Sequence, residues 1–225
     1  MSKKIIIITG ASRGIGLATA KLLQPLAERL VLVASQQHSF RSVQGEFGSE
    51  TSFHGVDLSS PDEIQSFSED LSSRLDRVDV LVNNCGVYLE KQLIESSLPE
   101  IQRQIDVNLR APILLTHKFL ALLNKGSSSI VVNISSIAAQ STPAGQSVYS
   151  ASKAAVTAFS SSLRKELNPR GIRVTVIHPG SVNTWNDPEP NKLLRPEDVG
   201  SLVKFILEAD KNCQIDEVTL LALGA

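Results

Sequence analysis

Seven short runs of apolar, mostly β-branched residues recur along this chain of 225 residues. They lie at 5–8, 30–33, 51–56, 80–82, 130–132, 172–177 and 218–221, and the run at 51–56 is the weakest. Runs with little polar alternation are typical of strands that helices cover on both faces. The segments between them are mostly long enough for a crossover helix, which predicts parallel β–α–β units. We therefore expect a doubly wound α/β fold.

Local signals predict several helix boundaries. Ser60, Pro61 and Glu63 form a helix-start pattern in which Ser60 is the N-cap and Glu63 closes a capping box. The segment 195–198 predicts another helix start, and Pro25 should kink or end the first helix. We find no internal repeat and no interdomain linker, so we expect a single domain over residues 1–225.

Composition and charge exclude several classes of protein. Lys and Arg total 22 against 23 Asp and Glu, without a basic block, so we expect no nucleic-acid partner. The longest early apolar run is too short for a membrane span. Two cysteines, Cys85 and Cys213, cannot form a disulfide framework, which favours a reducing, cytoplasmic compartment.

Three glycines follow the first predicted strand directly, at Gly10, Gly14 and Gly16. Their spacing fits a tight turn at Gly10, close approach of a ligand at Gly14 and close helix–strand packing at Gly16. A helix that begins here presents unpaired N–H groups to a pyrophosphate. In this context the pattern predicts a dinucleotide site rather than an ordinary turn.

The end of the second strand bears on which dinucleotide binds. An NAD site usually has a carboxylate there for the ribose hydroxyls, but residues 30–41 contain no Asp or Glu. Arg13 offers a forked cationic partner for a 2′-phosphate, with Ser12 and Ser35 as hydroxyl donors. We therefore predict NADP(H); the alternative is that Arg13 is only a solvated loop residue.

Tyr149 and Lys153 lie one turn apart on a predicted helix, so they share a face. When hydride adds to a carbonyl, the resulting alkoxide needs a proton, which a phenol can donate. A nearby ammonium and an oxidised nicotinamide would both lower the phenol pKa from about 10. Ser136, at the end of the fifth strand, can donate a hydrogen bond to the developing oxyanion.

Taken in order, these motifs resemble the short-chain dehydrogenase/reductase family. The resemblance rests on Thr9, Gly10, Gly14, Gly16, the run 83–86 (Asn-Asn-Cys-Gly), Asn108, Ser136, Tyr149, Lys153, Pro179 and Gly180, and it extends from the first strand to the last. It implies a Rossmann-type fold, with a mainly parallel seven-stranded sheet and helices on both faces.

The resemblance also implies catalytic roles. Tyr149 would be the general acid, and Lys153 would tune the phenol pKa and bind the nicotinamide ribose. Ser136 would orient the substrate, with Ser135 the less favoured choice. Asn108 would hold a water molecule in a proton relay that ends at Lys153.

The resemblance places further residues along the cofactor. Asp57 would contact the adenine, 84–86 would lie along the adenosine ribose, and Thr184 would bond the carboxamide. The complete expected set is Gly10, Ser12, Arg13, Gly14, Ile15, Gly16, Ser35, Asp57, Leu58, Asn84, Cys85, Gly86, Tyr149, Lys153, Pro179, Gly180, Val182 and Thr184.

Pro112 supports the Asn108 role independently. In a regular helix the Asn108 carbonyl would accept from the N–H of residue 112, which proline lacks. We therefore predict a kink near Asn108 and a carbonyl that is free to bind water.

Some residues depart from the family pattern or carry weak signals. Cys85 replaces the usual alanine of its motif, and buried filler is favoured over a reactive thiol. A short substrate loop at about 181–195 suits small or varied carbonyls, and Trp185 either lines that pocket or anchors the loop. No metal site is expected, because the four histidines lack ligand spacing and are best read as solvated or packed: His38, His54, His117 and His178.

Two predicted helices, near 101–124 and 149–168, have small or apolar residues on more than one side. A helix that covers a sheet needs one apolar stripe. The second stripe indicates either further cover within the chain or a homodimer or homotetramer.

The function that we expect is NADPH-dependent reduction of a ketone or aldehyde, for example a 3-oxoacyl thioester, as the small-molecule substrate. One alternative is an NAD⁺-dependent alcohol dehydrogenase of the same family. The other is a non-catalytic NADP(H) sensor, which would have no need to keep Ser136, Tyr149 and Lys153 together.

Overall fold

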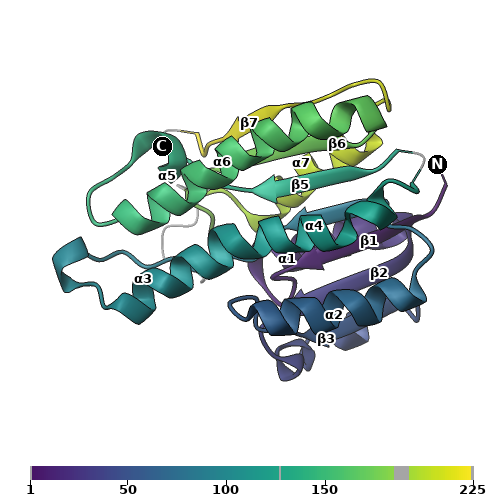
Figure 1. Cartoon of the computed structure of the whole chain (residues 1–225), viewed down its shortest axis with the longest axis horizontal. Coiled ribbons are helices and arrows are strands. Elements are labelled where there is room, and N and C mark those ends of the chain that lie inside the picture. The colour runs from purple at the N-terminus through teal and green to yellow at the C-terminus, as the bar shows by residue number, and fades with distance from the viewer. Residues whose placement is uncertain (1, 127, 185–192, 224–225) are drawn as a thin grey trace.

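All seven strands of the computed structural model form one sheet, and every pair of neighbours is parallel. The structure describes residues 2–126, 128–184 and 193–223. The strand order is β3-β2-β1-β4-β5-β6-β7 (Figure 1). The bounds are β1 Lys4–Thr9, β2 Ala27–Ala34, β3 Thr51–Gly55, β4 Val80–Asn83, β5 Ile130–Ile134, β6 Arg173–Pro179 and β7 Glu217–Leu220. The seven predicted strands are confirmed.

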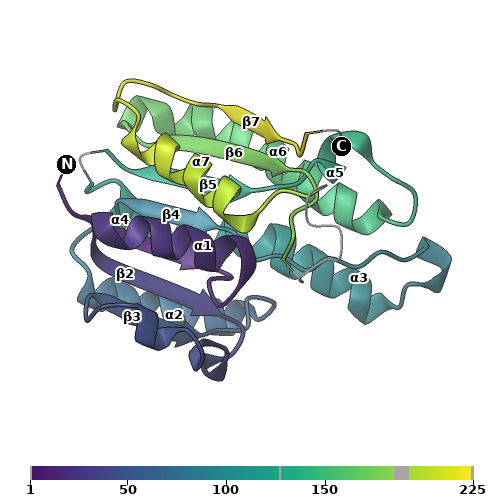
Figure 2. The same ribbon diagram turned by 180° about the vertical axis from the view of Figure 1, so that it is seen from behind.

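Helices cover the sheet on both sides, as predicted. Figure 1 shows α2, α4 and α6 on one face, and Figure 2 shows α1 and α7 on the other. Each layer of helices closes its own apolar core, one around Phe119 and the other around Leu23. The bounds are α1 Gly14–Leu23, α2 Pro61–Arg74, α3 Leu98–Ile105, α4 Ala111–Leu123, α5 Ala138–Ser141, α6 Ser147–Leu167 and α7 Pro196–Glu208. The fold is therefore the Rossmann-type α/β arrangement, and no described helix is long and apolar enough to cross a membrane.

Most of the predicted helix boundaries are confirmed. α1 ends at Leu23, and Pro25 lies in a short 3₁₀ turn behind it. α7 begins at Pro196, as predicted. At α2 the Ser60 hydroxyl accepts from the N–H of Glu63 at 3.3 Å. The predicted capping box is wrong in its other half, because the Glu63 carboxylate accepts from the N–H of Asp57 at 2.8 Å.

The helical stretch around Asn108 departs from a regular α-helix, as Pro112 predicts. Asp106–Arg110 forms a π-helical turn between α3 and α4, and the N–H of Ala111 donates to the carbonyl of Asp106. A π-helical turn shifts the hydrogen-bond register and is frequent at functional sites. The water-binding role of the Asn108 carbonyl stays a prediction.

The strand order reverses at β1 and β4, which lie side by side although β2 and β3 separate them in the sequence. Ligands of open α/β sheets bind beyond the carboxyl ends of the strands at such a point. The glycine loop follows β1, Asn84 follows β4, and Ser136 follows β5. The topology thus brings these separate segments to one edge of the sheet.

Candidate active site

The loop between β1 and α1 has a backbone that only glycine adopts easily. Gly10 and Gly14 have positive φ angles of 67° and 54°. A Cβ at Gly16 would overlap the carbonyl oxygen of Gly10, and a Cβ at Gly14 would lie 3.0 Å from Cγ2 of Thr184. α1 begins at Gly14, and Arg13 before it has no side-chain acceptor for the first-turn N–H groups. This cradle fits a pyrophosphate, because N–H groups converge where no side chain stands.

Hydrogen bonds of Asn84 and Thr9 connect this loop to the end of β4. The side-chain amide of Asn84 donates to the carbonyls of Thr9 and Gly10, at 2.9 and 3.1 Å. The Thr9 hydroxyl accepts from the N–H groups of Asn84 and Cys85, both at 3.0 Å. The side chain of Asn84 therefore supports the glycine loop from within the protein.

The end of β2 lies beside the same loop, because the N–H of Ala11 donates to the carbonyl of Val33 at 3.0 Å. Arg13 and Ser35 are exposed at this place, and Ser12 and Ile15 are half-buried. Beyond β3, the Asp57 carboxylate accepts from the N–H and hydroxyl of Ser59 at 3.0 and 2.8 Å, which lowers its pKa. Leu58, next to it, is buried.

Ser136, Tyr149 and Lys153 come together at the carboxyl ends of β4 and β5. The Ser136 hydroxyl lies close enough to the Tyr149 phenol to lower its pKa in part. Nζ of Lys153 lies 5.8 Å from the centroid of the Tyr149 ring and donates to the carbonyl of Ile134 at 2.9 Å. Ser135 points elsewhere, since its hydroxyl donates to the carbonyl of Lys153 at 3.0 Å.

The electrostatics of this group differ from the sequence expectation. Burial raises the pKa of Tyr149, and the nearby Ser136 hydroxyl opposes this only in part. Burial also lowers the pKa of Lys153 to about 8. The surrounding protein therefore favours the protonated phenol, whereas we expected Lys153 to lower its pKa. The physical reason is that desolvation penalises the phenolate, and the ammonium lies over the ring.

Gly86 lies between the ammonium of Lys153 and the side chain of Asn108. A Cβ at Gly86 would lie 3.3 Å from Nζ of Lys153 and 3.4 Å from Oδ1 of Asn108. The Asn108 amide donates to the carbonyl of Val87 at 2.9 Å and to the Ser152 hydroxyl at 3.1 Å. Its side-chain oxygen accepts from the N–H of Val87 at 2.7 Å. The side chain of Asn108 thus anchors the segment that follows Gly86.

The segment after β6 continues towards the glycine loop. The Pro179 carbonyl accepts from the N–H of Ile137 at 2.9 Å, and the N–H of Gly180 donates to Leu220 at 2.8 Å. Val182 pairs with Leu194, and Thr184 lies against Gly14. Trp185 and most of the expected substrate loop lie outside the described residues.

Cys85 is a half-buried thiol that packs against the apolar core, close to the expected filler role. Burial raises its pKa to about 11, although Lys153 lowers it in part. The fraction of thiolate is therefore small at neutral pH, which disfavours a nucleophilic role. Among the described residues, no group of three or more His, Cys, Asp or Glu side chains could hold a metal ion.

Sequence reasoning missed two residues near the reacting group. Tyr88 packs edge-on against Tyr149 with ring centroids 5.0 Å apart, and Gln146 donates to its hydroxyl at 2.9 Å. His178 is completely buried, with Nδ1 3.2 Å from the carbonyl oxygen of Ser136. The position of Tyr88 just after the 83–86 motif was the available signal for the first. His178 offered none beyond its place before Pro179.

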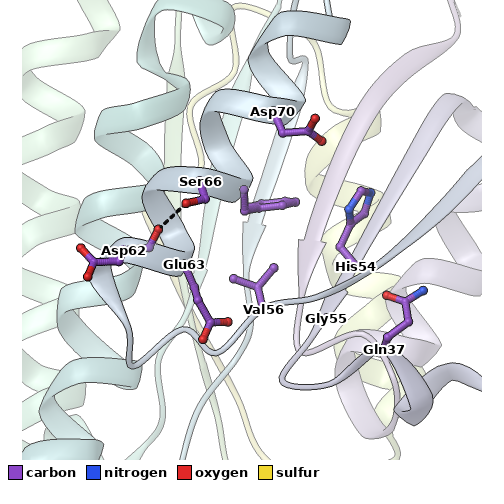
Figure 3. A pocket seen from close by; sticks show the side chains of 9 residues that line it. Gln37, His54, Gly55, Val56, Asp62, Glu63, Ser66 and Asp70 are labelled. Atoms are coloured by element: carbon purple, nitrogen blue, oxygen red, sulfur yellow. Dashed lines mark hydrogen bonds between the residues drawn. The ribbon is translucent and has the colours of Figure 1, made fainter.

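Two cavities lie outside the Ser136–Tyr149–Lys153 group. One cavity, of about 220 Å³, is lined by residues that include Gly14, Lys21, Thr184 and Glu197. Figure 3 shows the other, of about 520 Å³, between the end of β3 and the exposed side of α2. Its lining includes three carboxylates, so it disfavours an anionic ligand: Gln37, His54, Gly55, Val56, Asp62, Glu63, Ser66, Phe67 and Asp70.

Comparison with known proteins agrees with this geometry. The sequence profile described as short chain dehydrogenase matches residues 4–192. An uncharacterized oxidoreductase of Staphylococcus saprophyticus is 30% identical over 230 residues, covering 98% of this chain and 97% of the relative. A similar oxidoreductase of Staphylococcus aureus strain USA300 is 27% identical, with the same coverage.

Solved structures are also similar over nearly the whole chain. A metagenomic short-chain oxidoreductase in complex with NADP is 33% identical, with a TM-score of 0.87 and coverage of 98% and 97%. An alcohol dehydrogenase from Thermococcus sibiricus, complexed with 5-hydroxy-NADP, is 27% identical, with a TM-score of 0.91 and coverage of 100% and 98%. This chain therefore belongs to the short-chain dehydrogenase/reductase family and is an oxidoreductase that uses a nicotinamide cofactor.

Proposed function

We propose that this protein is an NADPH-dependent reductase that converts a ketone or aldehyde, including a 3-oxoacyl thioester, into an alcohol. The observation that carries this proposal is the grouping of a hydroxyl, a phenol and an ammonium beside the glycine cradle. The phenol supports this proposal: burial raises the pKa of Tyr149, which favours its protonated form, and that is the form that donates a proton in carbonyl reduction.

In this mechanism the reduced nicotinamide, when bound, supplies hydride to the carbonyl carbon. Ser136 donates a hydrogen bond to the carbonyl oxygen and stabilises the charge that develops there. Tyr149 transfers its phenolic proton to the same oxygen. Lys153 stabilises the phenolate that remains and holds the nicotinamide ribose, and the Asn108 carbonyl holds a water molecule that returns a proton through Lys153.

The residues after the strands would hold the cofactor. The cradle 10–16 would bind the pyrophosphate, Asp57 and Leu58 the adenine, and 84–86 the ribose. Pro179, Gly180, Val182 and Thr184 would border the nicotinamide. Arg13, with Ser12 and Ser35, would bind the 2′-phosphate. The absence of a carboxylate from 30–41 and the NADP complexes of similar proteins support NADP(H) over NAD(H).

We further propose that the whole chain acts as one catalytic domain and assembles as a homodimer or homotetramer. Ile113 on α4 and Ala151 and Ala158 on α6 are exposed on the outer side of their helices. A second subunit would cover them. Two free thiols support a cytoplasmic location.

The test is consumption of NADPH and NADH with a panel of aldehydes, ketones and a 3-oxoacyl thioester, together with fluorescence titration of both cofactors. We expect turnover with NADPH and a Kd for NADPH that Arg13→Ala raises about ten-fold or more, because a charged hydrogen bond to phosphate is lost. Arg29→Ala, at the opposite end of β2, is the matched control. Equal affinity for both cofactors, or no effect of Arg13→Ala, would contradict the NADP(H) assignment.

A further inference from the structure

His178 lies directly behind Ser136. It is on β6, its side chain is completely buried, and its Nδ1 is 3.2 Å from the backbone carbonyl oxygen of Ser136. Neighbouring N–H groups are already paired with β6: Ser135 donates to Ile177 at 2.8 Å, and Ile137 donates to Pro179 at 2.9 Å. His178 therefore contacts the carbonyl of the residue between these two backbone hydrogen bonds.

The other ring nitrogen of His178 faces a carboxylate. Its Nε2 lies 2.7 Å from Oε1 of Glu217, at the start of β7. The same oxygen accepts a hydrogen bond of 3.2 Å from the side-chain amide of Gln140 in α5. His178 thus contacts the Ser136 backbone on one side and Glu217 on the other. Glu217 in turn contacts Gln140 in α5, the helix that follows Ser136 in the chain. The segment from Ser136 to Gln140 is thus held at its first residue by His178 and at its last by Glu217.

The His178 ring lies between two hydrogen-bond acceptors. A carbonyl oxygen and a carboxylate are both acceptors, and a ring nitrogen contacts an acceptor favourably only through a proton. Nδ1 of His178 meets the Ser136 carbonyl within hydrogen-bond distance, whereas Nε2 makes a close contact of 2.7 Å with Glu217 that lacks regular hydrogen-bond geometry. Because the His178 side chain is buried, its ring nitrogens contact the Ser136 carbonyl and the Glu217 carboxylate rather than water.

We propose that His178 and Glu217 are positioning residues that hold the backbone of Ser136, and with it the Ser136 hydroxyl, beside the Tyr149 phenol. The inference rests on the proposed reductase function, in which Ser136 orients the carbonyl oxygen. Neither residue touches the reacting atoms: both act on the backbone of Ser136, whose hydroxyl also accepts from the N–H of Ala138 at 3.1 Å. Loss of the pair lets the hydroxyl of Ser136 move away from the phenol.

The variants separate the two contacts. His178→Leu removes both, His178→Asn keeps a donor close to the position of Nδ1, and Glu217→Gln keeps a hydrogen bond without the charge. The matched control is Thr175→Val on the same strand, since the Thr175 hydroxyl donates to the carbonyl of Ile215 at 2.6 Å and is not in contact with the Ser136 segment. Thermal melting checks the fold of every variant.

The first measurement does not depend on turnover. In a Tyr88→Phe background Tyr149 is the remaining tyrosine, so ζ-¹³C tyrosine labelling gives one resonance. Its shift at neutral pH reports hydrogen bonding of the phenol. We expect it to move in His178→Leu, to stay near the parent value in His178→Asn, and to be unchanged in Thr175→Val.

The second measurement is turnover with NADPH. We expect His178→Leu to lower kcat by roughly ten- to hundred-fold, because small misplacements of an orienting group have effects of this size, and to leave the Kd for NADPH within about two-fold. His178→Asn should recover most of kcat. A ζ-¹³C shift that is the same in His178→Leu and Glu217→Gln as in the parent overturns the positioning role, whether or not any carbonyl is reduced. Absence of turnover in the parent protein refutes the proposed function alone.

Discussion

At the scale of single residues, the site is governed by how burial changes two titrating groups in opposite ways. Burial raises the pKa of Tyr149 and lowers that of Lys153 to about 8. The phenol therefore keeps its proton at neutral pH, while the ammonium is close to losing one. This is the arrangement that a proton donor beside a proton reservoir requires.

Replacement of the phenol tests the proposed general acid. Tyr149→Phe keeps the ring that packs against Tyr88 but removes the proton. We expect kcat to fall by about 10²–10⁴-fold, the usual contribution of general acid catalysis, with little change in the Kd for NADPH. Steady-state kinetics and fluorescence titration measure the two quantities. Turnover at the parent rate would refute the assignment.

The buried ammonium of Lys153 also has a consequence for stability. Its pKa is about 8 in the folded protein against an ordinary lysine value of 10.5, so between these values the unfolded chain binds more protons. Stability therefore rises with pH across this window, and below it the charge costs about 3 kcal/mol. At pH 7 the free energy of unfolding of Lys153→Met should be higher than that of the parent protein. This difference should shrink as pH rises from 8 to 10.5.

Denaturant unfolding at several pH values measures this difference. Lys165→Met is the matched control, because Lys165 is exposed on the same helix. An advantage of Lys153→Met that is constant with pH would contradict the interpretation.

At the scale of elements, the turn from β1 into α1 is the most demanding. A Cβ at Gly16 would overlap the carbonyl oxygen of Gly10, so Gly16→Ala must displace the loop. We expect a loss of about 1–3 kcal/mol of stability, typical of overpacking, and a clearly weaker affinity for NADPH. Gly45→Ala is the matched control, since no atom lies within 4 Å of the added Cβ and Gly45 has no positive φ. Denaturant unfolding measures the stability of each variant, and fluorescence titration measures its Kd for NADPH. Equal effects of Gly16→Ala and Gly45→Ala would refute the explanation.

The elements also explain how much the sequence could predict. Strands and the glycine turn follow from local patterns, because an apolar run or a glycine spacing reports the backbone of its own segment. The order of motifs made it possible to expect Ser136, Tyr149 and Lys153 together. The capping partner of Glu63 was missed because its carboxylate reaches Asp57 rather than Ser60. Tyr88 and His178 were missed because their partners are distant in the sequence, where no spacing rule applies.

At the scale of the whole molecule, the helix layers on the two faces of the sheet differ in how much of their outer surface the chain itself buries. α1 and α7 pack against each other on one face of the sheet, and α4 and α6 lie on the other (Figures 1 and 2). On this second face the exposed small or apolar residues are Ile113, Ala151 and Ala158. The predicted second stripe thus has an outer side that the described chain does not bury. The proposed subunit interface belongs there.

A charge at this surface tests the assembly. We expect the parent protein to elute as a homodimer or homotetramer and Ile113→Arg to shift it to a smaller species, because an unpaired guanidinium is costly in an apolar interface. Ser73→Arg, on the exposed side of α2, adds the same charge as a control. Size-exclusion chromatography with light scattering gives the masses. A parent protein of monomer mass would exclude the interface.

The two thiols differ in accessibility, and this has a practical result. Cys85 is half-buried beside Lys153 with its pKa raised to about 11, while Cys213 is exposed before β7. An alkylating dye at neutral pH should therefore attach at Cys213 alone, far from the phenol and the glycine cradle. The natural sequence thus provides a single attachment point for a fluorophore, without any engineered cysteine.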